Sequence, residues 1–397
     1  KEEAELQAAA AVRHYKTVTN LDEDQFTLTL QLAWLYVDHY RMYREAIELL
    51  DRTSASKPHA ANVAILLGYA CQQAGDLPRA LAEYRRALAL QPDAERVYNR
   101  AALILFQQRK PGEALELLAQ GLRRVENPRE LLLFLDLQGR IAMGAGQIDP
   151  AIRCFELVAG AQTNNIAVRE LLGGLYNADD RPRRTIALLE PLANDNPINA
   201  AGLQYRLGEA YDLASDRVKA ERAFRLACAG DPPRHEPFVA LAKLLLADRP
   251  GDAEAVLREG LRRVPDHPSL YTFLGLLFVR GDDYERAIPE FKNAVKCLGA
   301  FKEDERPAAI PMLYYWDGMS LERSGRFDEA VRVFEQQIAV LPEMHESLNY
   351  LAYMWADKGT NLVQARQYVD RALKLEPDNP AYLDTLGGIL FRQGDFV

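Results

Sequence analysis

The chain has 397 residues and a formal net charge of −9, and no basic arm or cluster stands out along it. This charge balance argues against nucleic acid as a partner. The longest apolar runs, such as LLLFL at 131–135, are much shorter than the roughly 18 residues of a membrane-spanning helix, so we expect no membrane insertion by this chain.

The N-terminal residues predict a helix. Residues 1–15, KEEAELQAAAAVRHY, are typical of the interior of a helix rather than of a signal peptide. The first residue is Lys1 rather than Met, so we expect that upstream residues have been removed. We assign residues 1–26 to an N-terminal capping helix and its connection.

From residue 27 a pattern with a period of about 34 residues recurs along the chain. A small residue is followed by alanine, then by an aromatic residue and, near the end of the unit, by proline. The most regular units have Gly68, Ala80, Tyr84 and Pro92; Gly208, Ala220, Phe224 and Pro232; Gly275, Ala287 and Phe291; and Gly318, Ala330, Phe334 and Pro342. The pattern predicts about ten complete units and the first half of an eleventh.

Each unit reads as two helices, which predicts an all-α fold. Apolar residues recur at three- and four-residue spacings on both sides of a break such as AGD at 74–76. Glycine at the break is expected to adopt a positive φ, and Asp76 and Asp283 to cap the second helix. Helices of about 12 to 15 residues are marginal alone, so they must pack on each other. We expect the small residue to allow close helix approach, the aromatic residue to fill the next gap, and proline to end the second helix.

Three segments interrupt the regular pattern. Residues 299–309, GAFKEDERPAA, form a charged insertion between repeats 1–8 (residues 27–298) and the remaining repeats (residues 310–397). We interpret this insertion as a solvated loop, with a partner contact as the alternative. Residues 126–130 lengthen the connection before the fourth unit, and Pro191 is predicted to kink the second helix of the fifth.

The eleventh unit contains only its first helix. Its apolar residues would be exposed without a second helix, so we expect that the natural chain continues or that a second copy docks there to form a homo-oligomer. These residues are Leu383, Leu386, Ile389 and Phe391.

The sequence contains no recognisable catalytic, cofactor-binding or metal-binding constellation. The six histidines are scattered without an HExxH motif, and neither a phosphate-binding loop nor a GxSxG motif occurs. His235 and His267 occupy nearly equivalent junctions in successive units, where they can stack side by side, but two ligands without a third rarely hold a metal. The four cysteines form no CxxC pair, and we expect them to be small buried residues.

The chain resembles the tetratricopeptide repeat family. LGEAY at 207–211, followed by Ala220, Phe224, Ala227 and Pro232, is similar to the signatures of that family's two helices, and the resemblance covers roughly residues 27–397. It implies a right-handed α-solenoid whose first helices line a concave groove that binds peptides or proteins. Residues 348–395 are also similar to the closing repeats of bacterial, often envelope-associated, multi-repeat proteins.

The resemblance also implies which residues face the groove. They lie three residues before, one after and four after the small residue of each first helix. The predicted groove residues are Trp34, Tyr69, Asn99, Phe106, Arg140, Asn177, Tyr205, Glu209, Lys243, Tyr315, Met319, Glu322, Asn349 and Tyr353. The alternative is that Trp34, Tyr69 and Phe106 belong to the core because the assigned register is wrong by one.

The leading hypothesis is a non-catalytic scaffold or adaptor that binds protein or peptide partners in this groove. Clamping of a chaperone tail, for which the resemblance implies lysine and asparagine at two groove positions, is disfavoured. No lysine lies three residues before the small residue of any unit, and no asparagine lies one residue after it. The alternatives are the targeting arm of an enzyme whose catalytic domain lies outside this chain, and a self-assembling scaffold. The similarity of residues 348–395 favours the bacterial cell envelope, whereas unpaired cysteines favour the cytosol.

Overall fold

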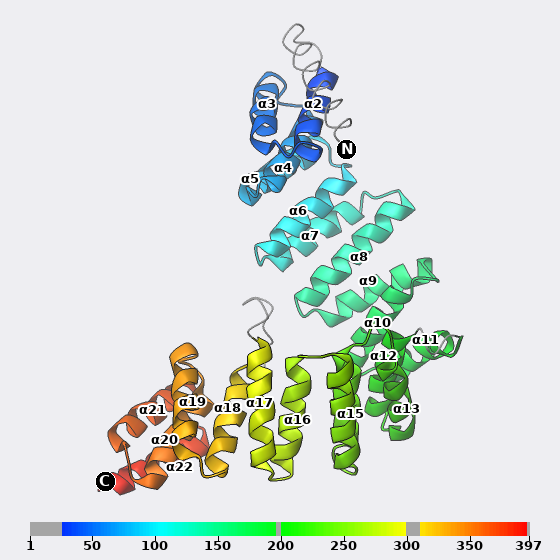
Figure 1. The fold of residues 1–397 in the computed structure, drawn as a ribbon. Coiled ribbons are helices and arrows are strands. Elements are labelled where there is room, and N and C mark those ends of the chain that lie inside the picture. The colour runs from blue at the N-terminus through cyan, green and yellow to red at the C-terminus, as the bar shows by residue number, and fades with distance from the viewer. Residues whose placement is uncertain (1–25, 196–199, 299–309, 395–397) are drawn as a thin grey trace. The chain divides into compact units, whose positions relative to one another are not determined.

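The computed structural model describes residues 26–195, 200–298 and 310–394, and these residues form helices joined by short turns, without a β-strand (Figure 1). The chain divides into two compact units, unit 1 up to Arg184 and unit 2 from Thr185. Residues 1–25 of the predicted N-terminal segment (1–26) and the predicted insertion 299–309 lie outside the described residues. Within the described part of the chain, no helix combines the length and apolar character needed to cross a membrane.

The helices follow the predicted order of pairs. Unit 1 contains α2 (Phe26–Asp38), α3 (Tyr43–Ser56), α4 (Ala61–Gln73), α5 (Leu77–Leu90), α6 (Glu95–Gln107), α7 (Pro111–Leu122), α8 (Pro128–Gly144), α9 (Ile148–Ala161) and α10 (Ile166–Ala178). The division between the units falls within α11 (Pro182–Asp195), which includes Pro191. Unit 2 continues with α12 (Ala201–Leu213), α13 (Arg217–Cys228), α14 (His235–Leu245), α15 (Pro250–Arg263), α16 (Pro268–Arg280), α17 (Tyr284–Leu298), α18 (Ile310–Arg323), α19 (Phe327–Val340), α20 (His345–Lys358), α21 (Leu362–Leu375) and α22 (Pro380–Gln393).

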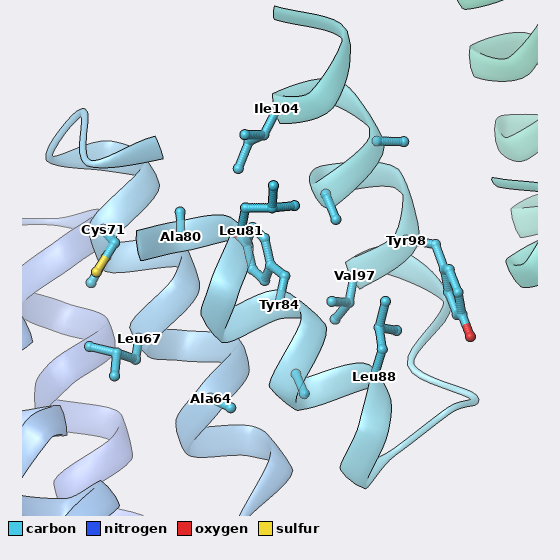
Figure 2. Close-up of a cluster of buried hydrophobic side chains, with 14 of the residues drawn as sticks. Ala64, Leu67, Cys71, Ala80, Leu81, Tyr84, Leu88, Val97, Tyr98 and Ile104 are labelled. Atoms are coloured by element: carbon cyan, nitrogen blue, oxygen red, sulfur yellow. The ribbon is translucent and has the colours of Figure 1, made fainter. Parts of the chain in front are cut away.

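Within each unit the pairs stack as an α-solenoid. In unit 1 each helix from α2 to α9 packs on the next, and in unit 2 each helix from α12 to α21 does so. First helices of successive repeats also touch, as α2 does with α4 and α6 with α8. Buried side chains form extended clusters, one of which includes Leu67, Cys71, Tyr84 and Val97 (Figure 2). Such stacking buries the apolar face that a single helix pair would leave in water.

The small residue and the aromatic residue of a repeat are in direct contact. A Cβ added to Gly68 would lie 2.7 Å from the Tyr84 ring, and one added to Gly208 would lie 2.4 Å from the Phe224 ring. The aromatic ring thus covers the glycine of its own repeat, so the expectation that the ring fills the next gap between helices was incomplete. The small residue is required because the ring occupies the space that a side chain would need.

The turns between paired helices follow the predicted chemistry in some repeats and depart from it in others. Asp76 accepts a hydrogen bond from the Arg79 amide at 3.1 Å, and Asp283 accepts one from the Arg286 amide at 3.3 Å. Gly75 has a φ of +85°, as predicted. In the turn before α17, however, the positive φ of 57° belongs to Asp282, since aspartate tolerates the left-handed region better than most residues.

Ion pairs between second helices link neighbouring repeats. A guanidinium nitrogen of Arg184 lies 3.1 Å from a carboxylate oxygen of Glu156, and Arg286 contacts Glu254 at 2.5 Å. These side chains are substantially exposed, so each pair contributes at most about 1 kcal/mol. Burial of apolar side chains therefore provides most of the stability.

Candidate binding surfaces on the first helices

The predicted groove residues all lie on first helices, from α2 to α20. Thirteen of the fourteen are at least partly exposed, whereas Met319 is 8% exposed and buried. Met319 therefore offers little surface to a partner. Trp34 is 49% exposed, which contradicts the alternative that it belongs to the core, while Tyr69 and Phe106 are half-buried.

The first helices of unit 1 carry an apolar surface, which we call the N-terminal face and define by Trp34, Tyr69, Arg100, Leu103 and Phe106. Trp34, Tyr69 and Leu103 occupy the same repeat position on α2, α4 and α6. Leu103 is 40% exposed, and Phe106 packs on Gly144 of α8, where an added Cβ would lie 2.6 Å from its ring. This surface is apolar because α4 has no charged residue and α2 has only Asp38 at its end.

Arg100 is the polar centre of the N-terminal face, and the sequence pattern did not identify it. Its guanidinium lies over the Tyr69 ring, 4.4 Å from the ring centroid, in a cation–π contact. Burial raises the pKa of the nearby Tyr84 hydroxyl to about 12, and the positive charge of Arg100 opposes that rise. Arg100 lies two residues before the small residue, outside the three positions that the family resemblance assigned to the groove.

Polar groove residues in the following repeats are paired. Arg140 contacts both carboxylate oxygens of Asp136, at 2.7 and 3.2 Å. Glu209 forms an ion pair with Arg206 at 2.9 Å, and Lys243 lies over the Phe273 ring at 4.5 Å. The charges of Arg140 and Glu209 are therefore partly neutralised within the chain.

A second aromatic surface lies in unit 2, and we call it the C-terminal face. It consists of Tyr315 and Glu322 on α18 and Tyr350 and Tyr353 on α20. The Tyr350 ring lies 5.5 Å from the Tyr315 ring and 6.0 Å from the Tyr353 ring, between centroids. The Tyr350 hydroxyl donates a hydrogen bond to Glu322 at 3.1 Å, and both burial and this carboxylate raise its pKa.

Sequence reasoning missed Tyr350, although it connects the predicted Tyr315 and Tyr353. Tyr350 occupies the same repeat position as Arg100, two residues before the small residue. In both repeats the side chain at this position contacts the preceding first helix, Arg100 through Tyr69 and Tyr350 through Tyr315. A large side chain recurring at this position was the signal available in the sequence.

The histidine pair stacks as predicted. The rings of His235 and His267 lie 3.6 Å apart between centroids, with 18° between their planes. Burial and the neighbouring His235 lower the pKa of His267 to about 4. Across the described ranges, no group of three histidine, cysteine or carboxylate side chains is placed to hold a metal ion.

The cysteines are free in the part of the chain that the structure describes. Cys71, Cys154 and Cys297 are buried, as expected, and Cys228 is half-buried. Burial raises the pKa of Cys71 to about 11 and that of Cys228 to about 12, which disfavours the reactive thiolate form.

Comparison with known proteins supports the repeat assignment. A family model described as tetratricopeptide repeat matches residues 30–95, 240–302 and 318–380. A TPR repeat-containing protein of Pseudomonas aeruginosa is 30% identical over 152 residues, which cover 38% of this chain and 24% of that protein. The BBSome complex member bbs-4 of Caenorhabditis elegans is 26% identical over 209 residues, which cover 52% of this chain and 44% of that protein. The chain thus spans less than half the length of each relative.

Solved structures of repeat proteins are also among the matches. A tetratricopeptide repeat protein from Parabacteroides merdae matches with a TM-score of 0.49 and 15% identity, over 66% of this chain and 98% of that one. The family matches in three separate regions agree with the helix pairs of the structure. Residues 30–95, 240–302 and 318–380 of the chain are thus identified as tetratricopeptide repeats.

Proposed function

We propose that the chain is a non-catalytic scaffold that binds protein or peptide partners on the first helices of its repeats. The observation that carries this proposal is the distribution of exposed apolar side chains. Ten of the fifteen large apolar residues that are exposed among the described residues lie on first helices. They are Trp34, Leu103, Leu133, Met143, Ile166, Leu213, Met312, Tyr353, Leu383 and Phe391.

These residues suit protein recognition because several of them are aromatic. Tyrosine and tryptophan bury a large area on binding and lose little conformational freedom, since each has only two side-chain torsions. On the C-terminal face, the contacts of Tyr350 with Tyr315 and Tyr353 hold the rings before a partner arrives. Such pre-organisation lowers the entropy lost on binding.

The proposal is tested by affinity capture from a lysate of the source organism, using three forms of the chain. The first is the parent, and the second carries Tyr205→Ala and Tyr353→Ala on first helices. The third is a matched control with Val218→Ala and Val363→Ala, which are exposed residues on the second helices of the same two repeats. Circular dichroism establishes that all three forms are folded.

We expect the parent and the second-helix variant to retain the same proteins, identified by mass spectrometry, and the first-helix variant to lose them. Retention by the first-helix variant together with loss by the second-helix variant would place the binding surface on the opposite helices.

A further inference from the structure

Arg100 differs from Arg96 and Arg140, two other arginines on the first helices of unit 1. Arg140 pairs with Asp136, and Arg96 pairs with Glu130 at 3.3 Å. Among the described residues, no carboxylate lies within the 4.0 Å ion-pair distance of Arg100. The N-terminal face therefore has one half-buried cation that lacks an anionic partner.

The surroundings of Arg100 favour an anion. The contact with Tyr69 holds the guanidinium in place, so less side-chain entropy is lost when a ligand binds. A carboxylate matches the planar fork of guanidinium donors through two parallel hydrogen bonds. Apolar neighbours such as Leu103 exclude water from a bound ligand, which strengthens a charge-assisted hydrogen bond.

We propose that the N-terminal face binds an acidic peptide segment, in which an aspartate or glutamate side chain pairs with Arg100 and apolar side chains contact Trp34 and Leu103. This inference rests on the proposed function, because it names the partner chemistry of one first-helix surface. Neighbouring first helices are about 10 Å apart, and two such spacings separate α2 from α6. About six residues of an extended peptide therefore span the distance.

A peptide library tests this inference with a defined probe. Random 12-residue peptides are displayed with their C-termini fused to the carrier, so aspartate and glutamate side chains are their only carboxylates. Selection is performed on the full chain, and binding of the enriched peptides is then measured by fluorescence polarisation. The variants are Arg100→Gln, Arg100→Lys, Trp34→Ala and the control Arg85→Gln, which removes an exposed arginine on the second helix α5.

We expect the enriched peptides to contain aspartate or glutamate beside apolar residues. Arg100→Gln should weaken their binding about tenfold or more, while Arg85→Gln leaves it unchanged. Arg100→Lys keeps the charge but loses the planar fork, so it should retain part of the affinity. Affinity for the parent should also fall as salt concentration rises.

The outcomes separate this inference from the proposed function. Peptides that lose affinity with Trp34→Ala but bind Arg100→Gln as tightly as the parent would overturn the acidic-partner inference and leave the proposed surface intact. Peptides that are insensitive to changes at both Trp34 and Arg100, and also to Tyr205→Ala and Tyr353→Ala, would contradict both proposals.

Discussion

Asp317→Asn is expected to stabilise unit 2 at neutral pH. Asp317 lies on α18 immediately before Gly318 and is 4% exposed. At the corresponding position other repeats have a buried leucine, such as Leu67 or Leu274. The Asp317 Oδ1 atom has no hydrogen-bond partner, so the core of this repeat holds an incompletely paired carboxyl group.

The effect on stability follows from the pKa of this carboxyl group. Burial raises the pKa of Asp317 from 3.8 to about 6, and the positive charges of Lys292 and Arg326 oppose the rise only in part. Below pH 3.8 the group is protonated in both the folded and unfolded states. As the pH rises through the folded pKa, the unfolded chain has already released its proton, so the free energy of unfolding falls. A shift of about two pKa units corresponds to roughly 3 kcal/mol in the free energy of unfolding. This stabilisation is fully lost above pH 6.

Urea unfolding measures this difference. In a Trp34→Phe background the remaining tryptophans, Trp316 and Trp355, both lie in unit 2, so their fluorescence reports on that unit. At pH 7.5 we expect Asp317→Asn to raise the free energy of unfolding by roughly 2 to 3 kcal/mol relative to the parent, and this difference should shrink towards zero as the pH falls from 6 to about 4.

Asp357→Asn is the matched control, because Asp357 is an exposed aspartate on α20. It should leave both the urea midpoint and its pH dependence close to those of the parent. Equal urea midpoints for the parent and Asp317→Asn at pH 7.5 would refute the reasoning, since they would show that the buried carboxylate is fully compensated in the folded state.

Three further predictions concern packing and pH. Phe224→Ala should lower the free energy of unfolding, measured with urea, by about 3 to 5 kcal/mol, and Tyr205→Ala on the proposed surface should lower it by less. Equal losses would mean that the assigned register is wrong. Gly208→Ala should be destabilising, because the new Cβ would lie 2.4 Å from the Phe224 ring. Gly112→Ala should be tolerated, because the new Cβ would have no neighbour within 4 Å. Similar melting temperatures for both variants would contradict this packing. The folded pKa of His267, about 4, lies below that of an unfolded histidine, so the contribution of neutral His267 to the stability of unit 2 should be lost as the pH falls from about 6.5 towards 4. His267→Phe should reduce that loss in thermal melts followed by circular dichroism, and an unchanged pH profile would contradict the expectation.

The repeat frame was predictable from the sequence because a strict packing relation recurs. Because a glycine must lie against the aromatic ring, the same pair of residues recurs at the same spacing, as with Gly68 and Tyr84 or Gly208 and Phe224. The helix pairs and the capping by Asp76 follow from local chemistry that one repeat contains by itself. These features required no knowledge of neighbouring repeats.

The candidate surfaces were only partly predictable, because they depend on contacts between repeats. Register alone suggested exposure of Met319, which is buried, and did not identify Arg100 or Tyr350, whose positions are defined by rings of the preceding repeat. Asp317 was overlooked for a related reason: a polar residue at a core position looks like a surface residue until its neighbours are known. Pairwise contacts across repeats therefore carry the information that periodicity lacks.

Site-specific photo-cross-linking tests the central claim most directly, namely that partners bind on the first helices. A benzophenone amino acid is placed at Tyr353 on α20 in one form of the chain and at Val363 on α21 in another, since both side chains are exposed within the same repeat. After irradiation in source-cell lysate, we predict cross-linked partners for the form with the probe at position 353 and few or none for the form with the probe at position 363. Cross-links that form at position 363 and are absent at position 353 would contradict the claim.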